Sequence, residues 1–152
     1  MDGQPEPAVP LVLARRTGQA ATFTALHEPY TGVPKLRRLE RLAENENAVV
    51  MAAEMPEYTD YLCVAFDDKP HTLTTGDGQA FSFSEYGYLR AGKAQPLVRG
   101  KLTAFRVKAD MVAGDSLAVE GKPVALRREG GFCSYGSLLQ QLASTPAPGA
   151  TG

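Results

Sequence analysis

Turn-forming residues interrupt the apolar sequence of this chain at short intervals. Between residues 11 and 126, glycine, proline, asparagine or aspartate separates each short apolar stretch from the next, and helical periodicity is scarce. Strands of about four to eight residues joined by tight turns produce this pattern. A helix instead repeats its apolar positions about every 3.6 residues over a longer stretch. We therefore predict an all-β protein, an antiparallel β-sandwich of about ten short strands.

The predicted strands are segments in which β-branched, aromatic and other apolar residues dominate. They cover residues 11–15, 21–28, 48–54, 58–66, 72–75, 80–84, 86–90, 101–109, 116–120 and 123–127. The Gly-Asp-Gly sequence at 76–78 is the clearest hairpin turn, because glycine adopts positive φ without a steric penalty. Similar turns are predicted at 114–115, 120–122 and 130–131. Such turns indicate that successive strands are antiparallel neighbours.

Periodicity is informative in two of these strands and in the segment at residues 35–43. Residues 58–66 are our first choice for the core, because the strand is apolar on both sides and is expected to lie centrally between two layers. Alternation along residues 101–109 predicts that one face of the strand carries Leu102, Ala104 and Arg106, and that the opposite face carries Thr103, Phe105 and Val107. Residues 35–43 have apolar residues at helical spacing, but so short a helix is marginal, which leaves helix and strand both open.

The length of 152 residues favours one domain, since two separate cores would each be marginal. We place the β-sandwich domain at residues 11–143, with one or two helical turns at 138–142. Proline-rich sequence on either side predicts a linker or disordered tail at residues 1–10 and a Pro/Gly/Ala-rich tail at residues 144–152.

Charge and cysteine content limit the partners of the chain. Lys plus Arg number 16 and Asp plus Glu 17, a balance that disfavours nucleic acid as a partner. We expect no membrane partner either, because no apolar run is long enough to span a bilayer. Cys63 and Cys133 leave two alternatives open, a disulfide in an oxidising compartment or two small buried thiols.

Motifs that carry enzyme chemistry are absent from the sequence. His27 and His71 are the only imidazoles, and no Gly-x-Ser-x-Gly sequence supplies a nucleophile. The two histidines and two cysteines do not have the spacing of a zinc site. The glycines at 76 and 78 begin like a dinucleotide fingerprint, but the third glycine and the following helix are missing. We therefore assign no catalytic residue, no metal and no cofactor.

A resemblance to a known family is carried by residues 21–36, Ala-Thr-Phe-Thr-Ala-Leu-His-Glu-Pro-Tyr-Thr-Gly-Val-Pro-Lys-Leu, which read as a strand ending in Glu-Pro-Tyr. Together with Tyr-Leu-Arg at 88–90 and the hairpins between 102 and 124, this stretch resembles the C-terminal β-sandwich region of heparinase II/III-like polysaccharide lyases. The resemblance covers residues 11–126. It implies that residues 35–42 form a strand after the Glu-Pro-Tyr turn.

The resemblance also implies a function. Such lyases cleave acidic polysaccharides with residues of a helical toroid, which this chain lacks, so we expect a non-catalytic accessory domain that is structural or contacts the glycan. Its partners would be the catalytic domain of the parent protein and acidic polysaccharide, in the periplasm or outside the cell. An independent carbohydrate-binding module for acidic polysaccharides and a small polysaccharide lyase are the alternatives.

Tyr86, Tyr88 and Arg90 are the candidate glycan-binding residues. Alternation along a strand places them on one face, where the rings can stack on sugars and the guanidinium can pair with a uronate carboxylate. The competing interpretation is two half-buried tyrosines with an arginine beside them. Glu28, Pro29 and Tyr30 are expected to end a strand and form a corner. An acid–base pair of His27 and Glu28 is disfavoured, because neighbours on a strand point to opposite faces.

Overall fold

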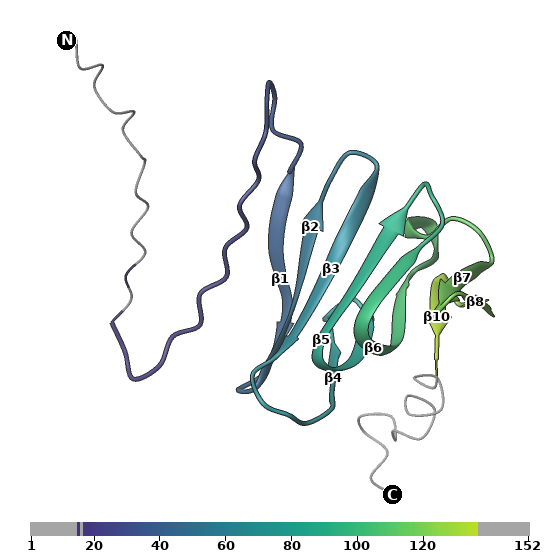
Figure 1. Cartoon of the computed structure of the whole chain (residues 1–152). Coiled ribbons are helices and arrows are strands. Elements are labelled where there is room, and N and C mark those ends of the chain that lie inside the picture. The colour runs from purple at the N-terminus through teal and green to yellow at the C-terminus, as the bar shows by residue number, and fades with distance from the viewer. Residues whose placement is uncertain (1–14, 16, 137–152) are drawn as a thin grey trace, which may run out of the picture.

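The computed structural model describes residue 15 and residues 17–136, and this part of the chain is an all-β, sandwich-like fold (Figure 1). Its elements, in chain order, are β1 (Arg38–Glu44), β2 (Ala48–Glu54), β3 (Tyr58–Ala65), β4 (His71–Thr74), β5 (Ala80–Gly92), β6 (Leu97–Lys108), the 3₁₀-helix η1 (Ala109–Met111), β7 (Ser116–Val119), β8 (Lys122–Ala125), β9 (Arg127–Glu129) and β10 (Phe132–Tyr135). The predicted fold class is confirmed. Among the described residues, no helix is long and apolar enough to cross a bilayer.

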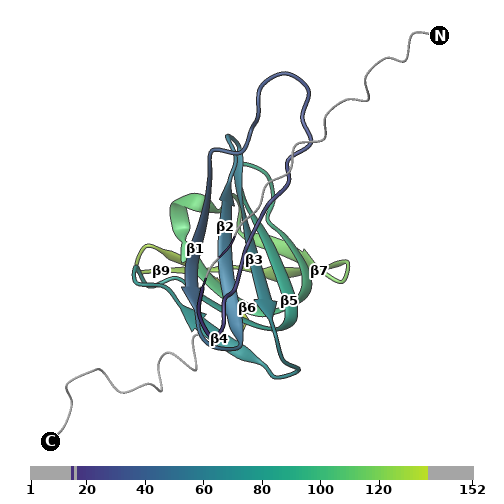
Figure 2. The ribbon, with the colours of Figure 1, turned by 90° about the vertical axis from the view of Figure 1, so that its left-hand side faces the viewer.

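All the strands belong to one hydrogen-bonded sheet with the order β1-β2-β3-β5-β6-β10-β9. β4 pairs with β5, and the β7–β8 hairpin joins the sheet through a short parallel pairing of β7 with β6. The remaining pairings are antiparallel. In Figure 2, β7 and β9 run across β1, β2 and β3 from behind, so the sheet has curled into two facing layers.

The curl arises in the two long strands, β5 and β6. The first half of β5 pairs with β4 and with the second half of β6, whereas its second half pairs with β3 and the first half of β6. Between the halves the register of β5 against β6 shifts, and Glu85 and Gly100 have φ of 57° and 68°. Extra residues of this kind bend a strand and increase its twist. The predicted strands 80–84 and 86–90 are therefore one bent strand.

The core fills the space between the two layers. Its largest fully buried side chains come from both, namely Tyr61, Phe81, Phe83, Phe105, Leu89 and Leu117. The rings of Tyr61 and Phe81 are tilted against each other with centroids 5.1 Å apart. Cys63 and Cys133 are buried in the same core as free thiols, and burial raises the pKa of both. Of the two alternatives for these cysteines, the structure has the buried thiols.

The predicted sidedness of two strands needs correction. β3 is central in the sheet, between β2 and β5, but only its inward side chains Thr59, Tyr61 and Cys63 are buried. Its outward leucine and valine are covered only in part. In β6, the partners of Ser82 and Phe83 are Ala104 and Leu102, so the register skips Thr103. Because of this irregularity, Leu102 packs in the same core as Phe105 and Val107, whereas strict alternation had placed it on the opposite face from them.

The structure also corrects the N-terminal part of the strand prediction. Residues 21–28 are extended but belong to no strand, and they run along the outer side of β1, β2 and β3 (Figures 1 and 2). There the Nη2 atom of Arg41 donates to the Thr22 carbonyl oxygen at 3.2 Å. The helix considered for residues 35–43 is wrong, because β1 pairs with β2 and packs Leu42 and Ala43 against the core. A strand in this region is what the resemblance implied.

At the C-terminal side, β9 and β10 are strands that sequence patterning did not predict. They pair through the predicted turn at 130–131, where both glycines have positive φ. The predicted turns at 76–78 and 120–122 are likewise the connections of the β4–β5 and β7–β8 hairpins. The tails at 1–10 and 144–152, the helical turns at 138–142 and most of the strand at 11–15 lie outside the described residues.

Candidate functional site

The outer face of β3, β5 and β6 carries the predicted glycan-binding residues. Tyr86, Tyr88 and Arg90 alternate with the buried Gly87 and Leu89, so their side chains share the side of β5 that faces away from the core. Tyr86 is 56% exposed, and Tyr88 and Arg90 are half-buried. The structure thus places all three on one face. Whether this face binds a glycan stays a prediction.

These side chains line a shallow hollow of about 450 Å³, which we call the outer hollow. Its lining comes from three adjacent strands and comprises Leu62, Cys63, Val64, Tyr86, Gly87, Tyr88, Arg90, Leu97 and Arg99. The pairing register explains this set, because Leu62 lies opposite Tyr88 and Tyr88 lies opposite Arg99. The hollow is therefore mostly apolar, and two arginines are among the residues that line it.

Asp60 holds two of the predicted residues in place. Its Oδ1 atom accepts hydrogen bonds from the Tyr88 hydroxyl at 2.7 Å and from Nε of Arg90 at 2.8 Å, and its Oδ2 accepts from Nη2 of Arg90 at 2.9 Å. The Arg90 guanidinium also lies over the Tyr58 ring, 3.8 Å from its centroid. The hydrogen bond to Asp60 raises the pKa of Arg90. Burial is the larger cause, and the contact with Asp60 the smaller one, that raises the pKa of Tyr88 to about 12. Arg90 is thus engaged within the protein.

The ring of Tyr86 rests on the backbone bend that curls the sheet. A Cβ atom added to Gly100 would lie 2.5 Å from Cε2 of Tyr86 and 2.6 Å from its carbonyl oxygen, closer than real Cβ atoms approach. Gly100 also has φ of 68°, which glycine adopts without strain. The bend therefore sets the ring against the backbone while much of it stays exposed to solvent.

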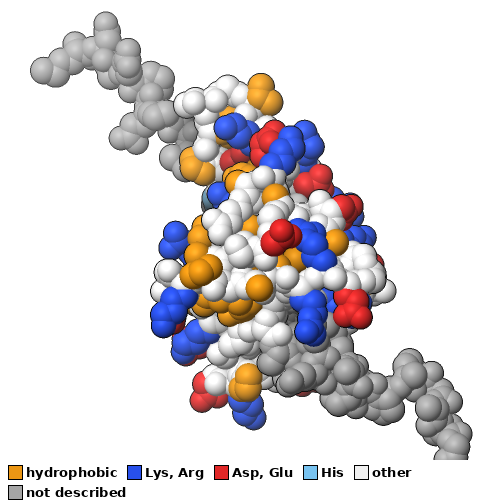
Figure 3. All heavy atoms as spheres, turned by 90° about the vertical axis from the view of Figure 1, so that its right-hand side faces the viewer, with side chains coloured by type: hydrophobic (Ala, Val, Ile, Leu, Met, Phe, Trp, Pro, Cys, Tyr) orange, Lys and Arg blue, Asp and Glu red, His pale blue; other side chains and the backbone are white. Residues whose placement is uncertain are grey.

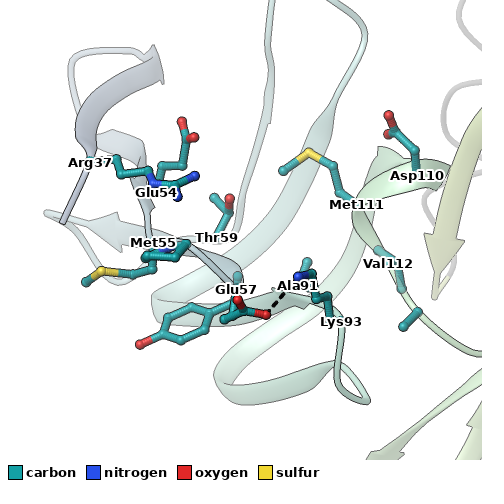
Figure 4. A pocket seen from close by; sticks show the side chains of 14 residues that line it. Arg37, Glu54, Met55, Glu57, Thr59, Ala91, Lys93, Asp110, Met111 and Val112 are labelled. Atoms are coloured by element: carbon teal, nitrogen blue, oxygen red, sulfur yellow. Dashed lines mark ion pairs between the residues drawn. The ribbon is translucent and has the colours of Figure 1, made fainter. Parts of the chain in front are cut away.

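A second hollow, the rim hollow, opens between the ends of β2 and β3 and the helix η1 (Figure 4). It has a volume of about 560 Å³. Arg37, Glu54 and Met55 lie on one side of it and Asp110 and Met111 on the other. An ion pair between Lys93 and Glu57, 3.0 Å from Nζ to Oε2, crosses its edge. Charges of both signs therefore line this hollow.

A polar network that is buried at Tyr61 and Gln79 and exposed at Asp77 lies beside the rim hollow, in a smaller hollow of about 270 Å³. The Tyr61 hydroxyl donates to Oε1 of Gln79 at 3.1 Å, and the Gln79 amide donates to both oxygens of Asp77. Asp77 also accepts a hydrogen bond from the Thr75 hydroxyl and forms an ion pair with Lys108. These contacts, the one with Thr75 above all, lower the pKa of Asp77 to about 2. Burial raises the pKa of Tyr61, which keeps its hydroxyl protonated. This network therefore joins the β4–β5 turn to Tyr61 of β3 and Lys108 of β6.

The two histidines lie in different parts of the fold, His71 on β4 and His27 in the segment before β1. His71 has its Nε2 atom 2.6 Å from Oδ1 of Asp67, and this contact lowers the pKa of Asp67. His27 is exposed, and the Glu28 carboxylate beside it accepts the backbone N–H groups of Lys35 and Leu36 at 2.7 and 3.1 Å. Glu28 thus closes a turn, although the strand that it was predicted to end is absent. In the described part of the chain, no group of three or more His, Cys, Asp or Glu side chains could hold a metal ion.

Three residues of the outer face did not emerge from sequence reasoning, namely Asp60, Leu62 and Arg99. Each lies on a neighbouring strand opposite a residue that was predicted. Alternation identifies which residues of one strand share a face, but the pairing register decides which residues of other strands join them. The predicted strand at 101–109 began after Arg99, whereas β6 begins at Leu97.

Comparison with protein-family models, curated proteins and solved structures finds no match to this chain. Two hollows on the described surface, the outer hollow and the rim hollow, are the candidate sites. The outer hollow combines an exposed aromatic ring, apolar walls and guanidinium groups. The rim hollow is lined by charges of both signs, and the hydrogen-bonded network lies in the smaller hollow beside it. The outer hollow has the more distinctive chemistry, because an aromatic ring beside a cation suits a ligand with both an apolar face and a negative charge.

Proposed function

We propose that the chain is a non-catalytic, accessory β-sandwich domain that contacts an acidic polysaccharide through the outer hollow. In this proposal it serves a parent enzyme of the heparinase II/III-like polysaccharide lyase type, which its sequence resembles. The observation that carries the proposal is the outer hollow itself, where the exposed ring of Tyr86 lies among apolar side chains and next to arginine.

The chemistry of an acidic sugar fits this surface. A pyranose ring has an apolar face of C–H groups, which stacks on aromatic rings such as Tyr86. A uronate adds a carboxylate, which guanidinium groups bind through paired hydrogen bonds. The face of the molecule drawn in Figure 3 is mixed in charge, with acidic and basic side chains around a hydrophobic area. Local contacts in the outer hollow, rather than a uniformly basic face, would therefore select the glycan.

The test is binding of the purified chain to polygalacturonate and to dextran, a neutral glucan, measured by isothermal titration calorimetry. We expect binding to polygalacturonate and a loss of about fivefold or more with Tyr86→Ala, taking as a guide the roughly 1–3 kcal/mol that an aromatic side chain contributes when a nucleic-acid base stacks on it. Tyr30→Ala is the matched control, since Tyr30 is 57% exposed and Tyr86 is 56% exposed. Equal losses in both variants would contradict the assignment of this site.

The same samples distinguish the other functions. New absorbance from unsaturated uronate would establish lyase activity and contradict the non-catalytic assignment. Absence of binding to every glycan would contradict glycan contact and leave a structural role next to a catalytic domain. Tight binding by the chain alone, unchanged when it is joined to its parent enzyme, would favour an independent carbohydrate-binding module.

A further inference from the structure

We propose that Arg99, and not Arg90, is the residue that recognises the carboxylate of the bound sugar. This inference rests on the proposed function, and it assigns the group that makes the site selective for acidic over neutral glycans. Sequence reasoning gave that role to Arg90, because Arg90 shares a strand face with Tyr86 and Tyr88. Two observations on the outer hollow transfer the role to its neighbour on β6.

The first observation is that Arg90 is already neutralised. Its Nε and Nη2 atoms donate to the two oxygens of Asp60, at 2.8 and 2.9 Å, which is the paired geometry that a ligand carboxylate would need. Its guanidinium is also stacked on Tyr58. A sugar carboxylate would have to displace Asp60, whose side chain is only 14% exposed, and would leave it without its partner.

The second observation is the position of Arg99. It lies directly opposite Tyr88 in the β5–β6 pairing, lines the outer hollow and is exposed. Among the residues that the structure describes, no carboxylate lies within ion-pair distance of its guanidinium. The next residue is Gly100, against which the Tyr86 ring is set. One stretch of β6 thus carries a free guanidinium and supports the aromatic ring.

These two features complement a single uronate unit. The apolar face of the ring would lie on Tyr86, and the carboxylate at its edge would accept paired hydrogen bonds from Arg99. Because the Asp60–Arg90 pair carries no net charge, Arg99 supplies the net positive charge among the residues that line the hollow. A neutral sugar would keep the stacking contact but lose the charged one.

The experiment compares polygalacturonate with its methyl ester, which has the same sugar rings without the charge. Affinities of the whole chain for both are measured by calorimetry at low and high salt. We expect Arg99→Ala to lower polygalacturonate affinity about tenfold and to leave the weaker binding of the ester unchanged, since hydrogen bonds to a charged group contribute at least about 1.4 kcal/mol, or a factor of ten. Arg99→Lys should be intermediate, because lysine keeps the charge but not the paired geometry.

Arg127→Ala is the matched control. Arg127 is also exposed, but it lies on the edge strand β9 and is not among the residues that line the outer hollow. Equal losses in Arg127→Ala and Arg99→Ala would overturn the proposal, as they would show a non-specific charge effect. A loss confined to Arg90→Ala would overturn it as well. Binding of dextran sulfate that is as tight as binding of polygalacturonate, and that also depends on Arg99, would overturn selectivity for a carboxylate. A loss with Tyr86→Ala but not with Arg99→Ala would refute this inference alone, whereas no binding by the unaltered chain would refute the proposed function.

Discussion

Replacing Asp60 with asparagine tests whether the structure holds Arg90 away from ligands. The change keeps the size of the side chain but removes its charge and one of its two acceptor oxygens. Asp60 accepts three hydrogen bonds, and its side chain is 14% exposed, against 41% for Arg90. Hydrogen bonds to charged groups contribute about 1.5–3 kcal/mol, and the exposed guanidinium regains part of this from water.

We therefore expect Asp60→Asn to lower the free energy of unfolding by about 2 kcal/mol. In a domain of this size, each kcal/mol lowers Tm by roughly 4 °C, so the expected fall in Tm is about 8 °C. Thermal unfolding followed by circular dichroism and urea unfolding measure it. Glu57→Gln is the control. Glu57 forms an ion pair with Lys93, and the two side chains are 65% and 77% exposed. Exposed pairs of this kind contribute less than about 1 kcal/mol.

The same variant should bind polygalacturonate more tightly than the unaltered chain. Asparagine no longer neutralises Arg90, so a second guanidinium becomes free beside the outer hollow and one negative charge is lost. Unchanged stability would refute the claim that Asp60 holds Arg90. Reduced stability with unchanged or weaker affinity would refute the claim that Asp60 keeps Arg90 from binding a carboxylate. Adding Arg90→Ala should abolish the gain.

Three further predictions concern the fold. Glu28→Ala should destabilise the chain by about 1 kcal/mol and speed hydrogen exchange at the amides of Lys35 and Leu36, which lose their acceptor; unchanged exchange would contradict this. Phe105→Ala, at a site with no exposed surface, should cost about 3–5 kcal/mol in urea unfolding, and a cost below 1 kcal/mol would show that Phe105 is not in the core. The pKa of Asp77 is about 2 in the fold, against 3.8 ordinarily, so its contribution to stability is present above pH 3.8 and is lost as the pH falls toward 2. Asp77→Asn should therefore flatten the fall of unfolding free energy over that range, and a fall as steep as in the unaltered chain would contradict this.

Much of the fold could be predicted because local chemistry decides it. Gly78, in the Gly-Asp-Gly turn at 76–78, and the paired glycines at 130–131 supply the positive φ that hairpins need, and the structure turns at these places. Residues 48–53 are all apolar, and β2 covers them together with Glu54. Residues 21–28 show the limit of such reasoning. They have the composition of a strand, but no neighbouring backbone pairs with them, so a strand does not form.

The candidate site divides in the same way. Alternation of side chains is a property of a single strand, so the sequence by itself determined that Tyr86, Tyr88 and Arg90 share a face. Pairing between strands depends on register and on the bend at Glu85 and Gly100, which are settled only when the whole sheet closes over its core. That closure brought Asp60 to Arg90 and Arg99 to Tyr88. The tertiary structure alone therefore decided which arginine is held by Asp60 and which lies exposed opposite Tyr88.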